Sequence, residues 1–270
     1  MSGGYAQLGS LCNSVSFGAV LTGTGGTVVA PSATAHVKGS WVQFTASSPI
    51  DISYMYFASY FFSGTASNDS YAFDIAIGSS GNEKIICNNL IVSCQGEFNQ
   101  PQIYYAFPIS IPAGTRISVR CQAATASDQS VYVSLVAFDG AFNNSEGAAG
   151  IDSLGFSTTT TSGTTVTTGT NAKGSYAQLI SSTTKDYIGF IVAGDTHGIT
   201  PGTTPVTIDI AVGSSGNEKI ILADLPLDPY ATNINTPFFP LQIPSGTRIA
   251  ARGATTTAVP FNLTLLGVYA

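Results

Sequence analysis

Short apolar runs separated by turn-forming residues set the pattern of this chain. Runs rich in Val, Ile, Phe, Tyr and Thr alternate with Gly, Ser, Asn and Pro, and no window of helical length shows apolar residues at helical spacing without these breakers. In the segment from Phe73 to Ile77, the apolar residues at odd positions fall on one face, whereas Asp74 and Ala76 fall on the other. This pattern predicts a chain made of β-strands.

Eight strands are expected in the first half of the chain, where turn signals separate the apolar runs. The segment Gly78–Asn82 predicts a tight connection with glycines at positive φ, and Pro112-Ala113-Gly114 predicts a type II-like turn. Eight antiparallel strands in about 120 residues favour a jelly-roll or related β-sandwich. The expected strands lie near Thr27–Ala30, Ser40–Ala46, Asp51–Phe62, Ala72–Ile77, Lys84–Leu90, Tyr104–Ile111, Thr115–Cys121 and Val131–Phe138.

The sequence GSSGNEKII occurs twice, at Gly78–Ile86 and again at Gly213–Ile221. Such an identity is not expected by chance, and further matches flank both copies in the same order, which indicates an internal duplication. The flanking matches join Lys38–Phe44 to Lys173–Leu179, Phe107–Ile117 to Phe239–Ile249, and Val133–Phe138 to Thr264–Tyr269.

The duplication predicts how the chain divides into domains. We expect an all-β protein of two tandem β-sandwich (jelly-roll-like) domains, residues 1–140 with an N-terminal extension and residues 151–270, each long enough to bury a core. A loop-like segment at about residues 140–150 is expected to link them. The Thr- and Gly-rich stretch 157–169 matches 21–31, so it is expected to enter the second domain as its first strand and an adjoining loop.

Composition narrows the classes of partner. Charged residues make up 9% of the chain, against about 25% in an average globular domain, and the formal net charge is −6. With nine lysines and arginines, the chain lacks the basic stripe of a nucleic-acid-binding protein. No apolar run approaches the roughly 20 residues that span a bilayer, and the first residues do not resemble a secretory signal. We therefore expect neither a nucleic-acid nor a membrane partner.

Eight of the nine lysines and arginines of the chain fall at equivalent positions of the two repeats. Such placement favours an architectural role, either ion pairs or carbonyl clamps within each unit, with an inter-subunit or ligand contact as the alternative. The candidate acidic partners are Asp74 and Asp209, and Glu83 and Glu218, of which the glutamates are favoured for Arg116 and Arg248. The matched cations are Lys38 with Lys173, Lys84 with Lys219, Arg116 with Arg248, and Arg120 with Arg252.

The residues that carry most enzyme chemistry are sparse. His36 and His197 are not at equivalent positions, and no histidines or cysteines have the spacing of metal ligands. The Gly-Ser-Ser-Gly motif does not meet the pattern of a nucleophile elbow, although an acid/base pair of Asp and Glu within either unit stays open. We expect no enzyme, and no catalytic, cofactor-binding or metal-binding residue. The four cysteines, expected to be free thiols, are Cys12, Cys87, Cys94 and Cys121.

The two repeats resemble a known family through three motifs. These are KGSW, DIAIGSSGNEKII and FPISIPAGTRI, which lie within Lys38–Phe138 and have counterparts in Lys173–Tyr269. They are similar to a unit of virion structural proteins of tailed bacteriophages, including capsid decoration or cement proteins of cyanophages and related marine phages. The resemblance implies a homotrimeric β-sandwich protein on the virion capsid surface that stabilises the lattice of the major capsid protein. It also implies synthesis in the host cytoplasm and no catalysis.

Two alternatives to the cement function stay open at this point. The same unit also occurs in other phage appendages, so a tail, fibre or baseplate component is the first. Carbohydrate recognition is the second, because Trp41, Tyr176 and the tyrosines in 54–60 could stack on sugar rings. Core positions are favoured for these aromatic residues, since Trp41 lies in an alternating strand.

Overall fold

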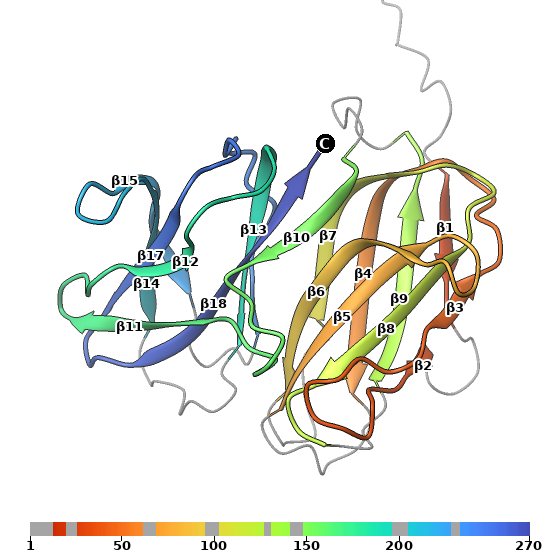
Figure 1. Cartoon of the computed structure of the whole chain (residues 1–270), viewed down its shortest axis with the longest axis horizontal. Coiled ribbons are helices and arrows are strands. Elements are labelled where there is room, and N and C mark those ends of the chain that lie inside the picture. The colour runs from red at the N-terminus through yellow and green to blue at the C-terminus, as the bar shows by residue number, and fades with distance from the viewer. Residues whose placement is uncertain are drawn as a thin grey trace, which may run out of the picture.

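The computed structural model describes residues 13–19, 26–61, 69–94, 103–126, 131–140, 148–195, 205–227 and 233–270. Over this part of the chain the structure is built of β-strands and connecting turns, as predicted, and contains no α-helix (Figure 1). In the same residues no helix has the length and apolar character needed to cross a membrane.

The first half of the chain forms two antiparallel sheets. One has the strand order β1-β9-β4-β7, with β2 also paired to β9, and the other the order β3-β8-β5-β6. These two orders are those of a jelly roll, in which most consecutive strands alternate between facing sheets, while β5 and β6 form a hairpin within one sheet. The strands are β1 (Ser14–Phe17), β2 (Thr27–Val29), β3 (Val42–Thr45), β4 (Ile52–Phe61), β5 (Asp69–Ile77), β6 (Lys84–Cys94), β7 (Ile103–Ile111), β8 (Ile117–Ala123) and β9 (Val131–Phe138).

The second half repeats this topology. One sheet holds β10, β18, β13 and β16 in that order, and the other holds β12, β17, β14 and β15. Strand β11 pairs with β18 at its start and with β17 at its end, so it joins the two sheets. The strands are β10 (Gly150–Leu154), β11 (Thr164–Thr170), β12 (Ala177–Ile180), β13 (Tyr187–Asp195), β14 (Val206–Val212), β15 (Lys219–Leu227), β16 (Asn233–Asn235), β17 (Ile249–Thr255) and β18 (Pro260–Tyr269).

Alternating apolar side chains fill the space between the sheets of each half. In β9 every second residue from Val131 to Ala137 is buried, whereas the residues between them are partly exposed. Phe57 and Phe73, from facing sheets, make a tilted ring contact in the first core, with their centroids 5.2 Å apart. Phe190 and Phe239 make a similar tilted contact in the second core, with their centroids 5.9 Å apart. Burial of these rings together with the many aliphatic side chains of the two apolar clusters stabilises each sandwich.

A short parallel pairing joins the two halves into one continuous ladder of strands. Ile151 of β10 pairs with Cys87 of β6, so β10 extends the first half's β6-β5-β8-β3 sheet and carries it into β18 of the second half (Figure 1). The apolar cluster of the first half also includes residues from the second, among them Ile191 and Val268. The halves are therefore packed against each other through buried apolar side chains.

All eight strands predicted for the first half are present, but two features of the prediction are wrong. Strand β1 at Ser14–Phe17 was missed, because its polar residues hide the apolar alternation. The stretch 157–169 was expected to open the second domain, whereas β10 comes before it and 157–162 forms a turn. Gly150 belongs to β10, and most of the predicted linker at 140–150 lies outside the described residues.

The predicted match between the last strands of the two repeats is also wrong by one residue. The sequence match makes Val133 and Thr264 equivalent positions of the two repeats. In the structure, Val133 pairs with Ser59 of β4. The residue of β13 equivalent to Ser59 is Gly194, and it pairs with Leu263 rather than with Thr264. A slip of one residue exchanges the two faces of a strand. In the corrected register Val133 and Leu263 occupy the same core position, and both are fully buried.

Candidate functional site

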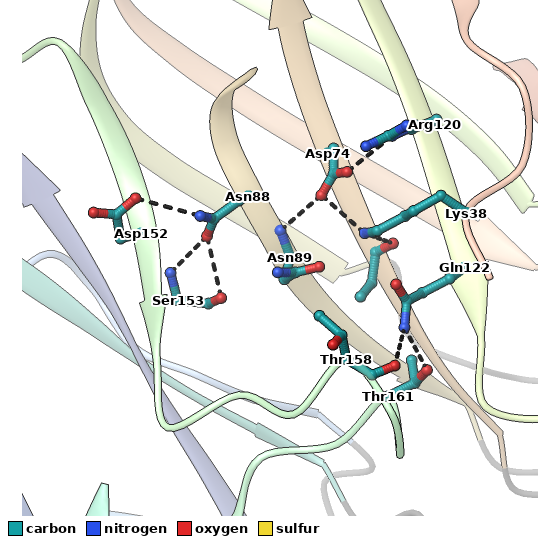
Figure 2. Close-up of polar contacts among 11 residues, drawn as sticks. Lys38, Asp74, Asn88, Asn89, Arg120, Gln122, Asp152, Ser153, Thr158 and Thr161 are labelled. Atoms are coloured by element: carbon teal, nitrogen blue, oxygen red, sulfur yellow. Dashed lines mark hydrogen bonds and ion pairs between the residues drawn. The ribbon is translucent and has the colours of Figure 1, made fainter. Parts of the chain in front are cut away.

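A buried carboxylate on the outer face of the first half's β3-β8-β5-β6 sheet organises three strands and a loop (Figure 2). Asp74 on β5 points away from the core and accepts from Lys38 Nζ at 2.8 Å and from Arg120 Nε at 2.9 Å. Its side chain is 3% exposed. The Asn89 amide also donates to Asp74 Oδ1, at 3.0 Å. Burial lowers the pKa of Lys38, and the neighbouring Asp74 opposes that change.

The same cluster recurs in the second half. Asp209 on β14 accepts from Lys173 Nζ at 2.8 Å, from Arg252 Nε at 2.9 Å, and from the Asp224 amide at 3.0 Å. Burial acts to raise the pKa of Asp209, but the hydrogen bonds from Lys173, Asp224 and Arg252 outweigh it and hold the pKa below its ordinary value. Asp209 is therefore held as a carboxylate by its donors.

In each cluster the backbone amide comes from a residue in the left-handed backbone conformation. Asn89 has φ of 48° and Asp224 has φ of 50°, and both lie at irregularities in the pairing with the neighbouring strand. Asn and Asp tolerate this conformation better than other residues with a Cβ. The side chains differ, because Asp224 forms a further ion pair with Lys173 at 2.9 Å, whereas in the first half Lys38 donates to the Ala72 carbonyl at 3.0 Å.

An aromatic ring covers the arginine of each cluster. The Arg120 Cζ lies 4.3 Å from the centroid of the Trp41 ring, and the Arg252 Cζ lies 4.6 Å from that of Tyr176. Both rings are partly exposed, so the expectation that they fill the cores is wrong. Trp41 precedes β3 and stacks on a cation outside the sandwich, where alternation within a strand does not determine its position.

A second ion pair closes the glycine turn that follows β5, as the sequence predicted. Arg116 Nη1 donates to Glu83 Oε1 at 3.1 Å and to the Gly78 carbonyl at 3.0 Å, and Glu83 Oε2 accepts from the Gly81 amide at 3.0 Å. Gly78 and Gly81 have φ of 109° and 84°, which confirms the predicted positive φ. A Cβ on Gly78 would lie 2.8 Å from the Asn82 carbonyl oxygen, so the turn requires glycine there.

The second half repeats this turn contact for contact. Arg248 donates to Glu218 at 3.1 Å and to the Gly213 carbonyl at 3.0 Å. Lys84 and Lys219 differ from the other matched cations, because both are exposed and no ion pair joins either to another described residue. The architectural prediction is confirmed for three of the four matched pairs of cations.

A set of polar contacts crosses from the first half to the second (Figure 2). Asn88 of β6 accepts from the Ser153 amide at 2.7 Å and donates to Asp152 at 3.3 Å. On β8, Gln122 donates to Thr161 Oγ1 at 2.7 Å and to the Thr158 carbonyl at 3.0 Å. These contacts fix β10 and the 157–162 turn of the second half on the sheet of the first half.

A buried carboxylate that the sequence did not indicate lies in the same region. Asp195 at the end of β13 is fully buried and accepts from the Gly163 amide at 2.9 Å, from Asn262 Nδ2 at 3.0 Å and from Ser70 Oγ at 3.3 Å. Ser70 belongs to the first half. The acidic side chain therefore ties the turn before β11 to strands of both halves, which no local sequence pattern could have revealed.

The cysteines and histidines of the described residues do not form a site. Cys87 and Cys121 are free and fully buried, as predicted, and burial raises the pKa of Cys121 to about 12. His36 has φ of 62° and its Nδ1 lies 3.0 Å from Thr161 Oγ1. Nowhere in the described ranges do three His, Cys, Asp or Glu side chains gather as metal ligands do. His197, Cys12 and the side chain of Cys94 lie outside the described residues.

Aromatic side chains also occupy the outer face of the β1-β9-β4-β7 sheet. Tyr54 and Tyr56 of β4 point away from the core, opposite to the buried Met55 and Phe57, so the core positions expected for these tyrosines are wrong. The ring of Tyr56 lies 4.9 Å from that of Tyr104, which is 38% exposed. We name the surface formed by Tyr54, Tyr56 and Tyr104 the tyrosine face, and all three of its side chains are at least partly exposed to solvent.

Comparison with known proteins places the chain in no family. No known protein family matches it. No curated protein matches it either. Among solved structures, the tandem CBM22-1-CBM22-2 domain of Paenibacillus barcinonensis Xyn10C aligns over 96% of this chain and 91% of its own, with 11% identity and a TM-score of 0.28. A chain of the cryo-EM structure of Broad Bean Stain Virus aligns over 95% of this chain and 88% of its own length, with 10% identity and a TM-score of 0.28. At this level of similarity neither match bears on function.

Proposed function

We propose that this protein is a non-enzymatic structural component of a tailed-phage virion, a capsid decoration or cement protein that stabilises the lattice of the major capsid protein. Its partners are the major capsid protein and further copies of itself in a homotrimer. It is made in the host cytoplasm and acts on the capsid surface, without a nucleic-acid or membrane partner. The resemblance of the KGSW, DIAIGSSGNEKII and FPISIPAGTRI motifs to such proteins is the first support.

The observation that carries the proposal is that most lysines and arginines are paired with acidic residues of the same chain. Seven of the nine lysines and arginines form ion pairs within the chain, and charged residues make up only 9% of the sequence, so the surface carries few unpaired cations. Such a surface can be buried against a protein lattice with little cost from desolvated charge. The seven paired cations are Lys38, Arg116, Arg120, Lys173, Lys185, Arg248 and Arg252.

The occupied carboxylates support the non-enzymatic part of the proposal. Asp74 and Asp209 each accept from two cations and a backbone amide, so neither has a free lone pair well placed to take a proton from a substrate. Glu83 and Glu218 each accept from an arginine and from a turn amide. The acid/base pairs that the sequence left open are thus engaged in holding turns and sheets.

Immunogold imaging of virions tests the proposal. Antibodies raised against the purified chain should label the heads of the phage that encodes it, and addition of the purified protein to undecorated heads should raise the temperature at which the heads release DNA. Label confined to the tail would overturn the cement function in favour of a tail, fibre or baseplate component. Unlabelled virions would overturn both structural functions.

Carbohydrate recognition is a second candidate, favoured by the position of Trp41. The partly exposed ring is held by Arg120 beside a hollow lined by residues of 28–32 and 38–42. An exposed aromatic ring of fixed orientation can stack on a sugar. Glycan-array binding that Trp41→Ala abolishes in a still-folded protein would establish this function, whereas an array without signal for the parent would remove it.

A further inference from the structure

The contact between the two halves uses one surface from each. The first half contributes the edge of its sheet at β6, where Ile86, Cys87 and Leu90 are at most 4% exposed. The second half contributes β10 and the outer face of the sheet that follows it, including Ile191 and Val268. We name these two surfaces the edge and the face, and their contact the joint. Each has an equivalent elsewhere in the chain, because the two halves share one topology.

The equivalent of the edge is β15, and it is open. Among the described residues β15 pairs with β14 alone, so its other side presents unpaired backbone groups. Ile221, Leu222 and Leu225 are each partly exposed, although their equivalents in β6 are buried, and Ala223 is exposed. A strand edge with exposed apolar side chains is a ready site for a further strand.

The equivalent of the face is the tyrosine face with the neighbouring strand β1. Tyr56 pairs with Val136 as Ile191 pairs with Leu266, so Tyr56 takes the place of Ile191. Ile191 and Leu266 are buried in the joint, whereas Tyr56 and Val136 are partly exposed. The equivalent face of the first half is therefore partly exposed, and within the described part of the chain no second sandwich covers it as the face of the second half is covered.

The residues at the two open surfaces differ from the equivalent residues of the joint, and the differences on one surface match those on the other. In the joint Cys87 meets Ile151, and the equivalent positions hold Leu222 and Ser14, so a small and a large residue are exchanged between the partners. Asn88 and Asp152 form a polar contact in the joint, at 3.3 Å between Nδ2 and Oδ1. The residues equivalent to this polar pair are both apolar, and they are Ala223 and Val15.

We propose that the β15 edge of one copy receives β1 and the tyrosine face of a second copy, so that a variant of the joint recurs between molecules. Because the two surfaces differ, the contact is head to tail, and repetition of it gives either a closed ring or a filament. A ring of three copies fits the homotrimer proposed above, but the contact itself does not depend on where the protein acts. Gly150 lies against the Ile86 carbonyl in the joint, and Asn13, immediately before β1, takes its place in the first half, so the second contact is slightly wider at that end.

Two blocking variants and their mixture test the direction of assembly. Ala223→Arg places a charge on the open edge, and Tyr56→Arg places one on the tyrosine face; both residues point outward, so both variants should fold. By light scattering the parent should form oligomers, each variant alone should be a monomer, and a one-to-one mixture should form heterodimers and nothing larger. Ala258→Arg, at an exposed position between β17 and β18, is the matched control and should assemble like the parent.

Several results would overturn the proposal. A monomeric parent at micromolar concentration would mean that Pro226 and the exposed Lys219 keep the edge unpaired. A mixture that stays monomeric, or either variant retaining the parent's mass, would exclude this contact. Hydrogen exchange of the parent gives a readout that needs no variant. Amides of β1 and β15 should exchange more slowly at high protein concentration than at low, and unchanged rates there would exclude the contact as well.

Discussion

Arg116 and Glu83 meet at 3.1 Å, across the turn between β5 and β6, with the arginine side chain 15% and the glutamate side chain 7% exposed. Arg116→Ala removes this ion pair and the bond to the Gly78 carbonyl, and it leaves Glu83 without its cation. We expect the free energy of unfolding to fall by about 1–3 kcal/mol, the usual range for a hydrogen bond to a charged group and its unpaired partner. Urea unfolding measures the change.

The repeat supplies two controls for this prediction. Arg248→Ala removes the same contacts in the second half and should cost a similar amount, since Arg248 has the same 15% exposure. Lys84→Ala removes an exposed cation next to Glu83 and should change stability by less than about 0.5 kcal/mol. If both arginine variants unfold like the parent yet lose the ability to attach to capsids, these arginines are interface residues.

Asp209 makes stability depend on pH in the acid range. Its pKa is lowered in the folded protein, so the unfolded chain binds a proton at a higher pH than the folded chain does. The stabilisation is therefore complete above the unfolded value of about 3.9 and is lost as the pH falls through the lower folded pKa. We expect Asp209→Asn to be less stable at neutral pH but to lose stability less steeply below about pH 4.

Urea unfolding at a series of pH values measures this dependence. Asp186→Asn is a suitable control for the loss of one acidic residue, because Asp186 is exposed and accepts a hydrogen bond from the Ser245 amide rather than from a cation. Its acid slope should resemble the parent's more closely than that of Asp209→Asn does. Equal slopes for the parent and Asp209→Asn would show that other carboxylates account for the acid sensitivity.

The sequence predicted the parts of the fold that depend on local chemistry. The glycines of the GSSG turn and the aliphatic alternation in β5 and β9 specify strands and turns directly, and all eight expected strands of the first half are present. The pairing of Arg116 with Glu83 was also predictable, because both follow turns at matched positions of the repeat. The repeat makes such a pair easier to predict, because a residue that is the same in both copies is more often part of the structure that the copies share.

Long-range features could not be obtained in this way. Asp195 is surrounded by residues from three separate segments, and its burial depends on how the halves dock. The sequence predicts a core position for Trp41 only if the alternation of β3 continues to the residue before the strand. In the structure β3 begins at Val42, and the Trp41 ring lies on Arg120. The register of β18 was misplaced by one residue because Val133 and Thr264 are similar in shape, whereas the pairing with β13 decides which face each occupies.

Burial should keep two thiols unreactive in the folded protein. Cys87 and Cys121 are fully buried, and burial raises the pKa of Cys121 to about 12, so almost no thiolate exists near neutral pH. In a Cys12→Ser/Cys94→Ser background, a thiol reagent such as DTNB should not react until urea unfolds the chain, when two thiols should appear. Rapid reaction of the native variant would mean that the first core opens readily or that these strands are not packed as described.

The contact of Asn88 with β10 should contribute to the stability of the whole chain. Asn88 accepts from the Ser153 amide at 2.7 Å and donates to Asp152, and Asn88→Ala leaves these groups without that partner. Alanine occupies the equivalent place in β15, so the backbone geometry there tolerates it and the loss belongs to the contact between halves. A cost of about 1–3 kcal/mol corresponds to a fall of several degrees in melting temperature.

Calorimetry distinguishes this effect from a local one. The parent should unfold in one transition, because a single apolar cluster includes residues of both halves. Asn88→Ala should lower that transition or split it, since the two sandwiches are then held together less tightly. Asn82→Ala, in the exposed turn before β6, removes an amide of the same size and should melt like the parent. If Asn88→Ala and Asn82→Ala melt at the same temperature, the polar contact adds nothing and apolar packing alone couples the halves.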